Sequence, residues 1–340
     1  MADLCCPVCR GELRETGSGA EPELRCDTCQ RTFPVILGIP DLRIFADPYI
    51  DIAADRAKGR RIAERYDSSD FAGLVSFYYS ITDTVPADQA RRFTAGLLGA
   101  PDRALTTLDA WEQLAGGAMP ASARFVELGC GTAPLLVHAG ARFREVIGVD
   151  IAFRWLVVAR KRLEEAGRAV PLVCACAESL PLRDAAWDIV AGESVLEVTR
   201  EPATAAAEAF RINRPGGRLY LTTPNRWSLG PDPHLGVPAG GWWPSSWLAA
   251  YARRHAALPP QRHLFSAGTV RKLLTAAGFK DIRLALPDVA ASQRRAMPGA
   301  MGAAADVYQA AKGVPGLREL LLAVGPLLLA TAERPGDRGS

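Results

Sequence analysis

Apolar runs separated by glycine- and proline-containing turns mark the middle of this chain as alternating strands and helices. The run from Phe125 to Leu128 has the length and composition of a buried parallel strand, and Val146 to Val149 repeats that character. The residues between these runs suit a turn followed by a helix. The pattern therefore predicts strand, turn, helix and strand in succession, which is typical of α/β folds.

The turn after the first run contains glycines that point to a ligand. Gly129 and Gly131 let backbone N–H groups come close to a bound molecule. Asp150 ends the second run, where a carboxylate can accept both hydroxyls of a ribose. These residues predict a nucleotide-type cofactor site. Two alternatives remain at this point: Asp150 caps a helix, or the turn belongs to a dinucleotide dehydrogenase, which also places an acid about 20 residues on.

Four motifs in order narrow this interpretation. The segment Glu127-Leu-Gly-Cys-Gly131 resembles motif I of the class I S-adenosylmethionine-dependent methyltransferases. Ala177 to Leu182 is similar to the adenine-side loop of that family, Ala186 to Val190 to its fourth strand, and Ala209 to Tyr220 to its helix, turn and fifth strand. The resemblance implies an α/β fold of the Rossmann-like class I methyltransferase type, with a mostly parallel sheet whose last strand is antiparallel.

The resemblance also implies residue roles. Glu127, Gly129 and Gly131 would surround the methionine part of S-adenosyl-L-methionine, Asp150 would bind its ribose, and Glu178 would lie near its adenine. For Glu178 the alternative is a solvated loop residue. The remaining residues expected at the cofactor are Cys130, Ile151, Ala177 and Glu193.

Three positions depart from the family pattern. The third glycine of motif I is Ala133, which a turn tolerates if φ is negative there. Cys176 stands where an aspartate often precedes the adenine loop, and Val198 replaces the histidine of a common Leu-Glu-His sequence. Cys130, Cys174 and Cys176 are expected to be small buried residues whose thiols carry no chemistry.

The first 45 residues carry a second signal. Cys6 and Cys9, and then Cys26 and Cys29, form two pairs with two-residue spacing, as in four-thiolate sites for structural Zn²⁺. Cys5 is the spare cysteine. The residues after the second pair, Thr32 to Leu42, are similar to the tail of zinc ribbons of the tRNA-methyltransferase-activator type, in which the module is structural or binds a partner protein.

A redox role and a disulfide framework are the alternatives to a zinc site at these cysteines. Thiol oxidoreductases also contain pairs with this spacing, but two pairs at ribbon spacing favour a metal. A disulfide framework needs an oxidising compartment, and the first five residues lack the charged start and apolar core of a secretion signal. We therefore expect reduced thiols and a cytoplasmic location.

Residues 46–120 are predicted to form a helical segment that covers the cofactor. It contains an aromatic cluster in which Tyr78 or Tyr79 could touch cofactor or substrate, although aromatic side chains at helical spacing are more often packing residues. Residues 121–335 are predicted to form the methyltransferase domain. In the helix after Asp150, the run Arg160 to Arg162 is expected to be solvated.

An insertion at residues 226–262 interrupts this domain and suggests a substrate lid. Ligands of open α/β sheets bind beyond the carboxyl ends of the strands, so an excursion from the fifth strand would lie over the methyl donor. Four tryptophans could form flat apolar walls or a local core: Trp227, Trp242, Trp243 and Trp247. His234 is the candidate general base and Asp232 its candidate orienting group, with His263 and Tyr251 as weaker alternatives. Asp232 could instead cap a turn.

The carboxyl-terminal patterns complete the domain. Ser266 to Gly278 predicts an amphipathic helix, Asp281 to Leu286 a strand, and Leu327 to Pro335 the antiparallel last strand. Leu317 to Ala330 is apolar, but it is shorter than the roughly 20 residues that span a bilayer and contains Glu319 and Pro326, so no membrane span is expected.

Composition limits the function further. The 340 residues include 40 basic and 37 acidic side chains, a balance that disfavours a nucleic-acid footprint. The sequence predicts a methyltransferase acting on a small-molecule, saccharide or lipid-linked biosynthetic intermediate, most readily at oxygen or nitrogen. The alternatives are an RNA methyltransferase that uses the ribbon to hold RNA, and a non-catalytic scaffold that binds a partner.

Overall fold

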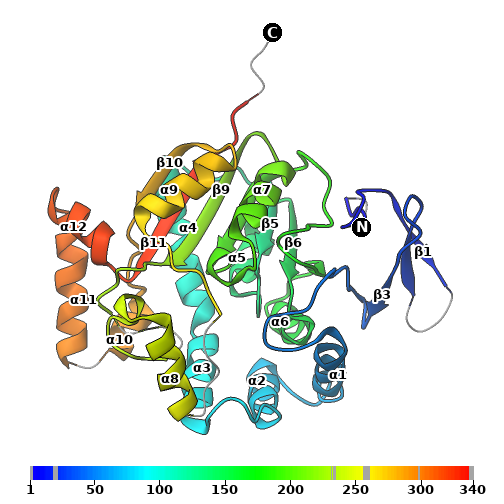
Figure 1. Cartoon of the computed structure of the whole chain (residues 1–340), viewed down its shortest axis with the longest axis horizontal. Helices are drawn as coiled ribbons and strands as arrows, with labels where there is room; N and C mark the ends of the chain where they lie inside the picture. Colours follow the sequence, from blue (N-terminus) through cyan, green and yellow to red (C-terminus); the bar gives the residue numbers. More distant parts are fainter. Residues whose placement is uncertain are drawn as a thin grey trace.

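The structure of the chain is a computed structural model that describes residues 3–17, 22–230, 232, 235–255, 261–297 and 299–336. Figure 1 shows a large sheet with helices on both sides and a small sheet at one edge. The last described residues lie at the end of the molecule opposite to the helices α1 (Ile52–Ala63), α2 (Phe71–Ser80) and α3 (Ala87–Leu98).

Within the described part of the chain, seven strands form the large sheet in the order β10, β11, β9, β8, β5, β6 and β7. Their bounds are β5 Arg124–Leu128, β6 Glu145–Asp150, β7 Leu172–Cys174, β8 Trp187–Glu193, β9 Asn213–Pro224, β10 Lys280–Ala285 and β11 Leu327–Glu333. The strands β7, β6, β5, β8 and β9 are mutually parallel, whereas β11 runs antiparallel to both of its neighbours, β9 and β10. The fold class expected from the sequence is confirmed.

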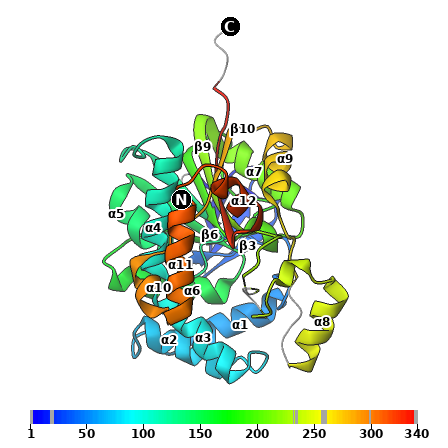
Figure 2. The same cartoon turned by 90° about the vertical axis from the view of Figure 1, so that its left-hand side faces the viewer.

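Alternating strand residues supply two hydrophobic cores, one on each face of the sheet. Phe125 belongs to one core and Val126 to the other, as the pleat of a strand requires. Figure 2 shows the helical layers on the two sides. The helices and short 3-10 turns have these bounds: α1 Ile52–Ala63, α2 Phe71–Ser80, α3 Ala87–Leu98, α4 Ala100–Ala115, α5 Pro134–Arg142, α6 Phe153–Glu165, η1 Leu196–Val198, α7 Pro202–Ile212, η2 Gly240–Trp242, α8 Ser245–Arg254, α9 Ala267–Ala276, α10 Ala291–Ala296, α11 Gly299–Ala311 and α12 Leu317–Val324.

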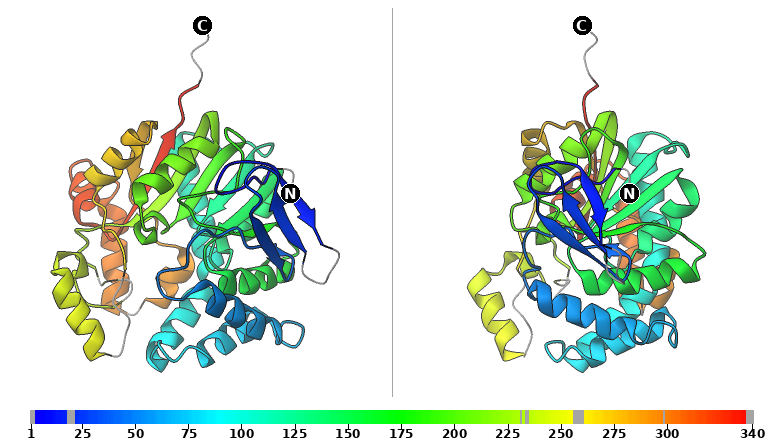
Figure 3. Two further views of the ribbon diagram at one scale, coloured as in Figure 1. Left: turned by 45° about the vertical axis from the view of Figure 1, so that its right-hand side comes forward. Right: turned by 90° about the vertical axis from the view of Figure 1, so that its right-hand side faces the viewer.

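The described residues between 3 and 45, here called the N-terminal module, contain a small antiparallel sheet. Its strands are β1 Leu13–Thr16, β2 Glu23–Cys26, β3 Thr32–Ile36 and β4 Ile39–Pro40. The module packs against the large sheet at the β7 edge (Figure 3). There Asp41 pairs with Cys174, and Leu42 N–H donates to the carbonyl oxygen of Cys174 at 2.8 Å.

The module occupies a position on the sheet that a crossover helix usually covers. Parallel strands are normally joined through a helix, but residues 175–186, which join β7 to β8, form no helix. The module's Leu4 and Phe33 share a core with Val173, Leu180 and Leu182 instead. The apolar face near β7 is therefore buried by the module.

The helices between the module and β5 are part of the main fold. The indole of Trp111, on α4, is fully buried and donates to the carbonyl oxygen of Leu221 at 3.3 Å. Helix α1 packs along α6. The sequence expectation of a solvated run from Arg160 to Arg162 is wrong, because the buried Arg162 donates to the carbonyl oxygen of Leu97 at 2.7 Å. Arg160 and Lys161 lie over the ring of Tyr66, between α1 and α2, and Arg162 lies over the ring of Phe71 on α2.

The carboxyl-terminal elements match their sequence patterns. Ser266 caps α9 by accepting from Thr269 N–H, and Gly278 follows the helix at φ +106°. The apolar stretch from Leu317 is divided between α12 and β11. None of the helices in the described segments is both long and apolar enough to cross a bilayer.

Candidate active site

The glycine turn between β5 and α5 satisfies its own backbone groups. The N–H groups of Gly129 and Cys130 donate to the carbonyl oxygen of Val149 at 2.8 and 3.1 Å. Gly131 N–H donates to Asp150 Oδ2 at 2.7 Å. The N–H groups of Gly129, Cys130 and Gly131 are therefore bonded within the protein, which differs from the expectation that they approach a ligand. The glycines are needed for shape, because a Cβ on Gly129 would lie 2.7 Å from Val195 Cγ2.

Ala133 departs from the condition set by the sequence. Its φ is +60°, so this alanine lies in the left-handed region where glycine is usual. It also precedes α5 as the helix N-cap and is fully buried. The replacement of the third motif glycine is thus not the mild change that a negative φ would have made it.

Asp150 is held rigidly at the end of β6. Its Oδ2 accepts from Gly131 N–H and its Oδ1 accepts from Ala152 N–H, both at 2.7 Å. Burial raises the pKa of Asp150 above its usual value, and the two backbone hydrogen bonds act in the opposite direction. Each oxygen keeps a second lone pair that can accept from a ligand hydroxyl. Ala152 is the N-cap residue of α6, so Asp150 both supports that helix start and faces a cavity.

Glu127 and Glu193 form a second acidic group beneath the turn, on the adjacent strands β5 and β8. Glu127 is 1% exposed, and its Oε2 has no hydrogen-bond partner among the described residues. Burial, with the nearby carboxylates of Glu193 and Asp150, raises the pKa of Glu127 well above its usual value. Burial likewise raises the pKa of Glu193, against a hydrogen bond from Thr107. A buried carboxylate oxygen without a partner is a place where a cationic ligand group would be stabilised.

A cavity of about 310 Å³ opens beside Asp150 at the carboxyl ends of β5 and β6. Of the residues expected from sequence, its walls include Gly129, Asp150, Ile151, Ala177 and Glu178. Cys130 points elsewhere, since its sulfur approaches Gly148 inside the sheet, and burial raises the pKa of its thiol well above the usual value. The carboxylate of Glu178 accepts from Arg200 N–H at 2.7 Å, so it also fixes the loop before α7.

Sequence reasoning missed several residues of this cavity. The segment that enters α1 contributes Phe45, Asp47 and Tyr49, and α6 contributes Trp155. Trp155 packs on Tyr78 with ring centroids 4.0 Å apart. Tyr79 lines a neighbouring cavity beside Gly131. No local motif marks residues 45–49, because their position depends on how the N-terminal module packs on the sheet.

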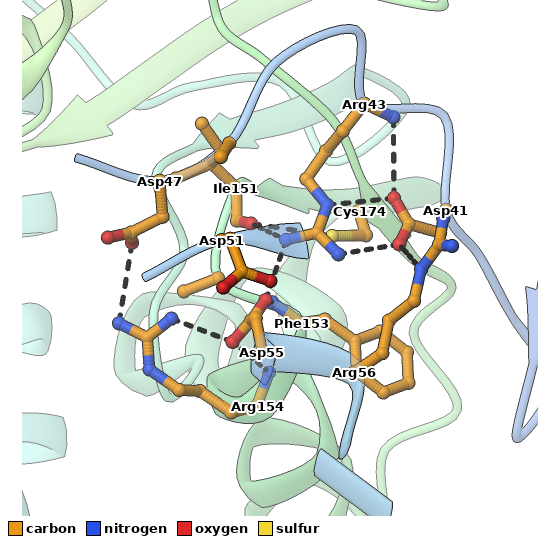
Figure 4. Close-up of polar contacts among 12 residues, drawn as sticks. Asp41, Arg43, Asp47, Asp51, Asp55, Arg56, Ile151, Phe153, Arg154 and Cys174 are labelled. Carbon is orange, nitrogen blue, oxygen red and sulfur yellow. Dashed lines mark hydrogen bonds and ion pairs between the residues drawn. The ribbon is translucent and has the colours of Figure 1, made fainter. Parts of the chain in front are cut away.

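A buried network of ion pairs holds that entering segment against the cavity (Figure 4). Arg43 binds Asp41 through Nε at 2.8 Å and Asp55 through Nη1 at 2.6 Å, and the three side chains are fully buried. Asp55 also accepts from the N–H of Phe153 at 2.8 Å and from Arg154 Nη1 at 2.7 Å. Burial opposes ionisation of Asp41, but hydrogen bonds from Arg43 and Arg56 hold its pKa below the usual value.

Comparison with known proteins adds an independent observation. Residues 126–221, which run from β5 into β9, match the family described as a methyltransferase domain. This stretch of the chain is similar to a methyltransferase domain.

Curated relatives are similar to about a third of the chain. The chain is 35% identical over 107 residues to a ubiquinone biosynthesis O-methyltransferase of Aromatoleum aromaticum, covering 31% of this chain and 46% of that protein. A protein of the same name from Idiomarina loihiensis is 31% identical over 112 residues, covering 32% of this chain and 46% of the relative. The chain thus spans less than half the length of these relatives.

Among solved structures, an S-adenosylmethionine-dependent methyltransferase from Thermotoga maritima is 20% identical, with a TM-score of 0.46. It covers 72% of this chain and 95% of the other.

Away from the methyltransferase domain, the four cysteines of the two pairs come together. The sulfur atoms of Cys6, Cys9, Cys26 and Cys29 all lie within 4.8 Å of one another. Cys6 and Cys29 are 3.6 Å apart and Cys9 and Cys26 are 3.4 Å apart. Four sulfurs bound tetrahedrally to Zn²⁺ at about 2.3 Å would be separated by about 3.8 Å, so the spacing suits that ion. Cys5 lies outside this group and its N–H donates to Pro181.

Of the two expected catalytic residues, the structure describes one. His234 lies outside the described residues. Asp232 is buried and forms an ion pair with Arg262 Nη2. Its Oδ1 accepts from Leu235 N–H at 2.9 Å, which is the turn-forming role that the sequence left open. Of the weaker candidates, Tyr251 stacks on His255, and His263 Nε2 lies 3.3 Å from the carbonyl oxygen of Arg200.

The tryptophans of segment 226–262 form two exposed pairs. Trp227 and Trp242 meet edge to face with centroids 4.9 Å apart, and Trp243 and Trp247 do so at 6.4 Å. All four remain at least 37% exposed. They are therefore walls of an open surface and not a closed local core. Helix α8 of this segment lies at the same end of the molecule as α1 to α3 (Figure 1).

Glu197 is a further titratable group that the sequence did not single out. It is 2% exposed and accepts from Thr223 Oγ1 at 3.1 Å. Burial raises the pKa of Glu197 to about 7. Its position in the Leu-Glu-Val sequence after β8 was the available signal.

Proposed function

We propose that this chain binds S-adenosyl-L-methionine in the cavity beside Asp150 and transfers its methyl group to a small-molecule acceptor. The observation that carries the proposal is the geometry of Asp150. Its carboxylate lines the cavity and is fixed by two backbone N–H groups, while lone pairs remain on both oxygens. That arrangement suits the two hydroxyls of a ribose.

The buried acids suit the other end of this cofactor. Glu127 Oε2 has no partner among the described residues, and a deprotonated carboxylate only accepts hydrogen bonds. The ammonium group of the methionine part would supply both the missing donors and a compensating charge. Glu193, on the neighbouring strand, would share that role. The residues present therefore fit the group.

The cofactor would provide a methyl group on a sulfonium, and the chain would provide position and shelter. Transfer requires in-line attack, so holding the acceptor at the correct angle supplies much of the rate. Helices α1 to α3 and α8 lie at the end of the sheet where this exchange would occur. Trp155 and the residues from Phe45 to Tyr49 would keep water from the cofactor.

The acceptor is proposed to be a small biosynthetic intermediate, with oxygen as the favoured methylated atom. Relatives named ubiquinone biosynthesis O-methyltransferase support oxygen, and the exposed tryptophans support an acceptor with a flat apolar part. A hydroxyl acceptor needs a base, and His234 stays our prediction for it because Asp232 is engaged by Arg262.

Zn²⁺ is proposed as the structural ion of the N-terminal module, held by the thiolates of Cys6, Cys9, Cys26 and Cys29. A ligand set of four cysteines leaves no open position for a substrate. The ion would stabilise the module and, through it, the covered face of the large sheet.

The direct test is calorimetric titration of S-adenosyl-L-methionine into wild type and Asp150→Asn, followed by transfer of labelled methyl into fractionated small molecules, lipids, RNA and protein. We expect binding that is lost or weakened at least tenfold in Asp150→Asn, and label in the small-molecule or lipid fraction. Label in RNA would replace this proposal with RNA methylation. Absence of cofactor binding by the wild type would leave only a scaffold role.

A further inference from the structure

A second cavity lies between segment 226–262 and the carboxyl ends of β8 and β9. Its volume is about 260 Å³, and its walls include Ser194, Asn225, Asp232 and Arg262. These polar side chains lie in a wall that is otherwise formed mainly by glycine and apolar residues, among them Leu264 and Leu327. The described residues that line this cavity include none of those assigned above to the cofactor. Ser194, which does line it, directly follows Glu193.

Arg262 is the residue in this cavity with unused binding capacity. Its side chain is 4% exposed, and Nη2 forms the ion pair with Asp232, whose side chain is 1% exposed. Its Nη1 has no hydrogen-bond partner among the described residues. A buried guanidinium nitrogen without an acceptor is costly, so the arrangement favours a ligand oxygen at this position. The planar guanidinium suits a carboxylate or phosphate in particular.

The backbone around this ion pair is closely fitted. A Cβ on Gly240 would lie 2.6 Å from Asp232 Cβ, and one on Gly241 would lie 1.9 Å from the carbonyl oxygen of Arg226. Asp232 also accepts from Leu235 N–H, and its own N–H donates to the carbonyl oxygen of Val237 at 2.7 Å. Arg262 is thus held by a compact loop whose two glycines permit the close approach.

On one side this second cavity shares a lining residue with the cofactor cavity. Ser194 lines both of them, directly after β8. Its φ is +53°, a conformation that non-glycine residues rarely adopt and that is found often at functional sites. A ligand group bound at Arg262 would therefore have the rest of its molecule within reach of the methyl donor.

On its other side the cavity meets the tryptophan surface. A groove of about 760 Å³ is lined by Trp227, Trp242 and Trp243 and shares Arg262 and Gly241 with the second cavity. Arg226 also lines this groove, with its guanidinium 4.9 Å from the Trp227 ring centre. The charged residues among the described lining of the groove are Arg226 and Arg262, and Asp232 balances the charge of Arg262.

We propose that Arg262 binds an anionic group of the methyl acceptor, while the flat apolar part of that acceptor lies in the groove of Trp227, Trp242 and Trp243. The acceptor class is an aromatic or similarly flat molecule with a carboxylate or phosphate. This inference rests on the proposed function, because the bound molecule is an acceptor only if the chain transfers a methyl group to it. The binding site itself is defined by Arg262 and the groove. Arg226 adds positive charge at the rim.

The test uses 2-naphthoate, 2-naphthyl phosphate and the uncharged 2-naphthamide as probes of the full chain, titrated by calorimetry with S-adenosylhomocysteine present and absent. We expect at least one anion to bind about tenfold or more tightly than the amide. Arg262→Gln should abolish that preference. Arg262→Lys should retain part of it, because the charge stays while the planar pair of donors is lost.

Because Arg262→Gln removes the cation that faces the buried Asp232 carboxylate, the double variant Asp232→Asn with Arg262→Gln makes both side chains uncharged and should fold. It too should bind anion and amide equally. Arg254→Gln, on α8 and outside the lining of both cavities, is the matched control and should bind like the wild type.

The outcomes separate this inference from the proposed function. Equal binding of anion and amide by the wild type, an anion preference that survives in the double variant, or no binding of any probe would overturn the role of Arg262. S-Adenosylhomocysteine is titrated alone in parallel. If it binds and the anions do not, the cofactor proposal stands and the acceptor site falls. If the anions bind through Arg262 and S-adenosylhomocysteine does not bind, the anion site stands and the cofactor proposal falls.

Discussion

Arg43 Nη1 lies 3.0 Å from the carbonyl oxygen of Ile151 and donates to it, which joins the end of the N-terminal module to the residue that follows Asp150. The same nitrogen binds Asp55, and Asp55 holds the N–H of Phe153 at the start of α6. Asp150 directly precedes Ile151 and lies three residues before Phe153. The network therefore supports the backbone that follows the proposed ribose carboxylate (Figure 4).

Asp55→Asn should destabilise the fold and weaken cofactor binding. The change leaves Arg43 and Arg154 without their shared carboxylate in a buried site, which typically costs about 3–5 kcal/mol. Chemical denaturation and calorimetric titration of S-adenosyl-L-methionine would measure the two effects. Asp51→Ala is the matched control on the same helix, since it removes only an exposed N-cap worth about 1 kcal/mol. Equal stability of the two variants would contradict the network's role.

Cys9→Ser should lose the bound zinc and also lower the affinity for S-adenosyl-L-methionine. The module holds the loop that carries Ala177 and Glu178, because Ser179 Oγ donates to the Pro7 carbonyl and Arg10 donates to the Leu180 carbonyl. Metal content by mass spectrometry and calorimetric titration would check both effects. Cys5→Ser is the control, as Cys5 lies in the module but outside the four-thiol group. A zinc-free Cys9→Ser protein with wild-type affinity would separate the module from the cavity.

Gly129→Ala should destabilise the protein more than Gly131→Ala. Both positions have positive φ, at +69° and +50°, so each alanine incurs a strain of about 1 kcal/mol. At Gly131 a Cβ meets nothing within 4 Å, whereas at Gly129 it would overlap Val195 and add about 1–3 kcal/mol. Unfolding of the ligand-free variants in urea would compare them. If the two alanines cost the same, the close approach of Val195 is not a constraint.

Glu197→Gln should change how stability depends on pH. Burial raises the pKa of Glu197 to about 7 in the folded protein, against the ordinary value of 4.5. Between these values the folded state binds more protons than the unfolded state, so this group makes stability fall as pH rises from about 4.5 to about 7 and adds no further slope above that. The variant lacks that loss, and its stability relative to wild type should rise over this interval by up to about 3 kcal/mol. Parallel stability curves for the two proteins would refute the assignment. Glu127, Glu193 and Asp150 act in the same direction in both proteins, so the difference reports on Glu197 alone.

The sequence allowed the sheet to be predicted because its signals are local. The apolar runs of β5 and β6, the intervening glycines and the terminal Asp150 lie within 27 residues and carry both the strand pattern and the turn. The cysteine pairs are equally local, and their sulfurs do come together. Such features need no knowledge of how distant segments pack.

What the sequence did not disclose depends on contacts between distant segments. Arg10 binds Glu208, almost 200 residues away, and Arg43 reaches Ile151 across 108 residues. Arg162 has a charge that suggested solvent, yet the helices before β5 bury it. Asp232 was predicted beside His234 because the two are neighbours in the chain, whereas its ion pair with Arg262, 30 residues away, was not foreseen.

The absence of a helix between β7 and β8 has a consequence for how this protein comes into being. The face that such a helix would have covered is completed only when the module folds, and the module's own order is proposed to depend on four thiolates sharing one ion. Residues 1–45 would then not be separable from the domain that follows, and a cell short of zinc would lose a methyl-transfer activity in which no zinc takes part. Metal supply would set how much working enzyme exists, at the step of folding and not at the step of chemistry.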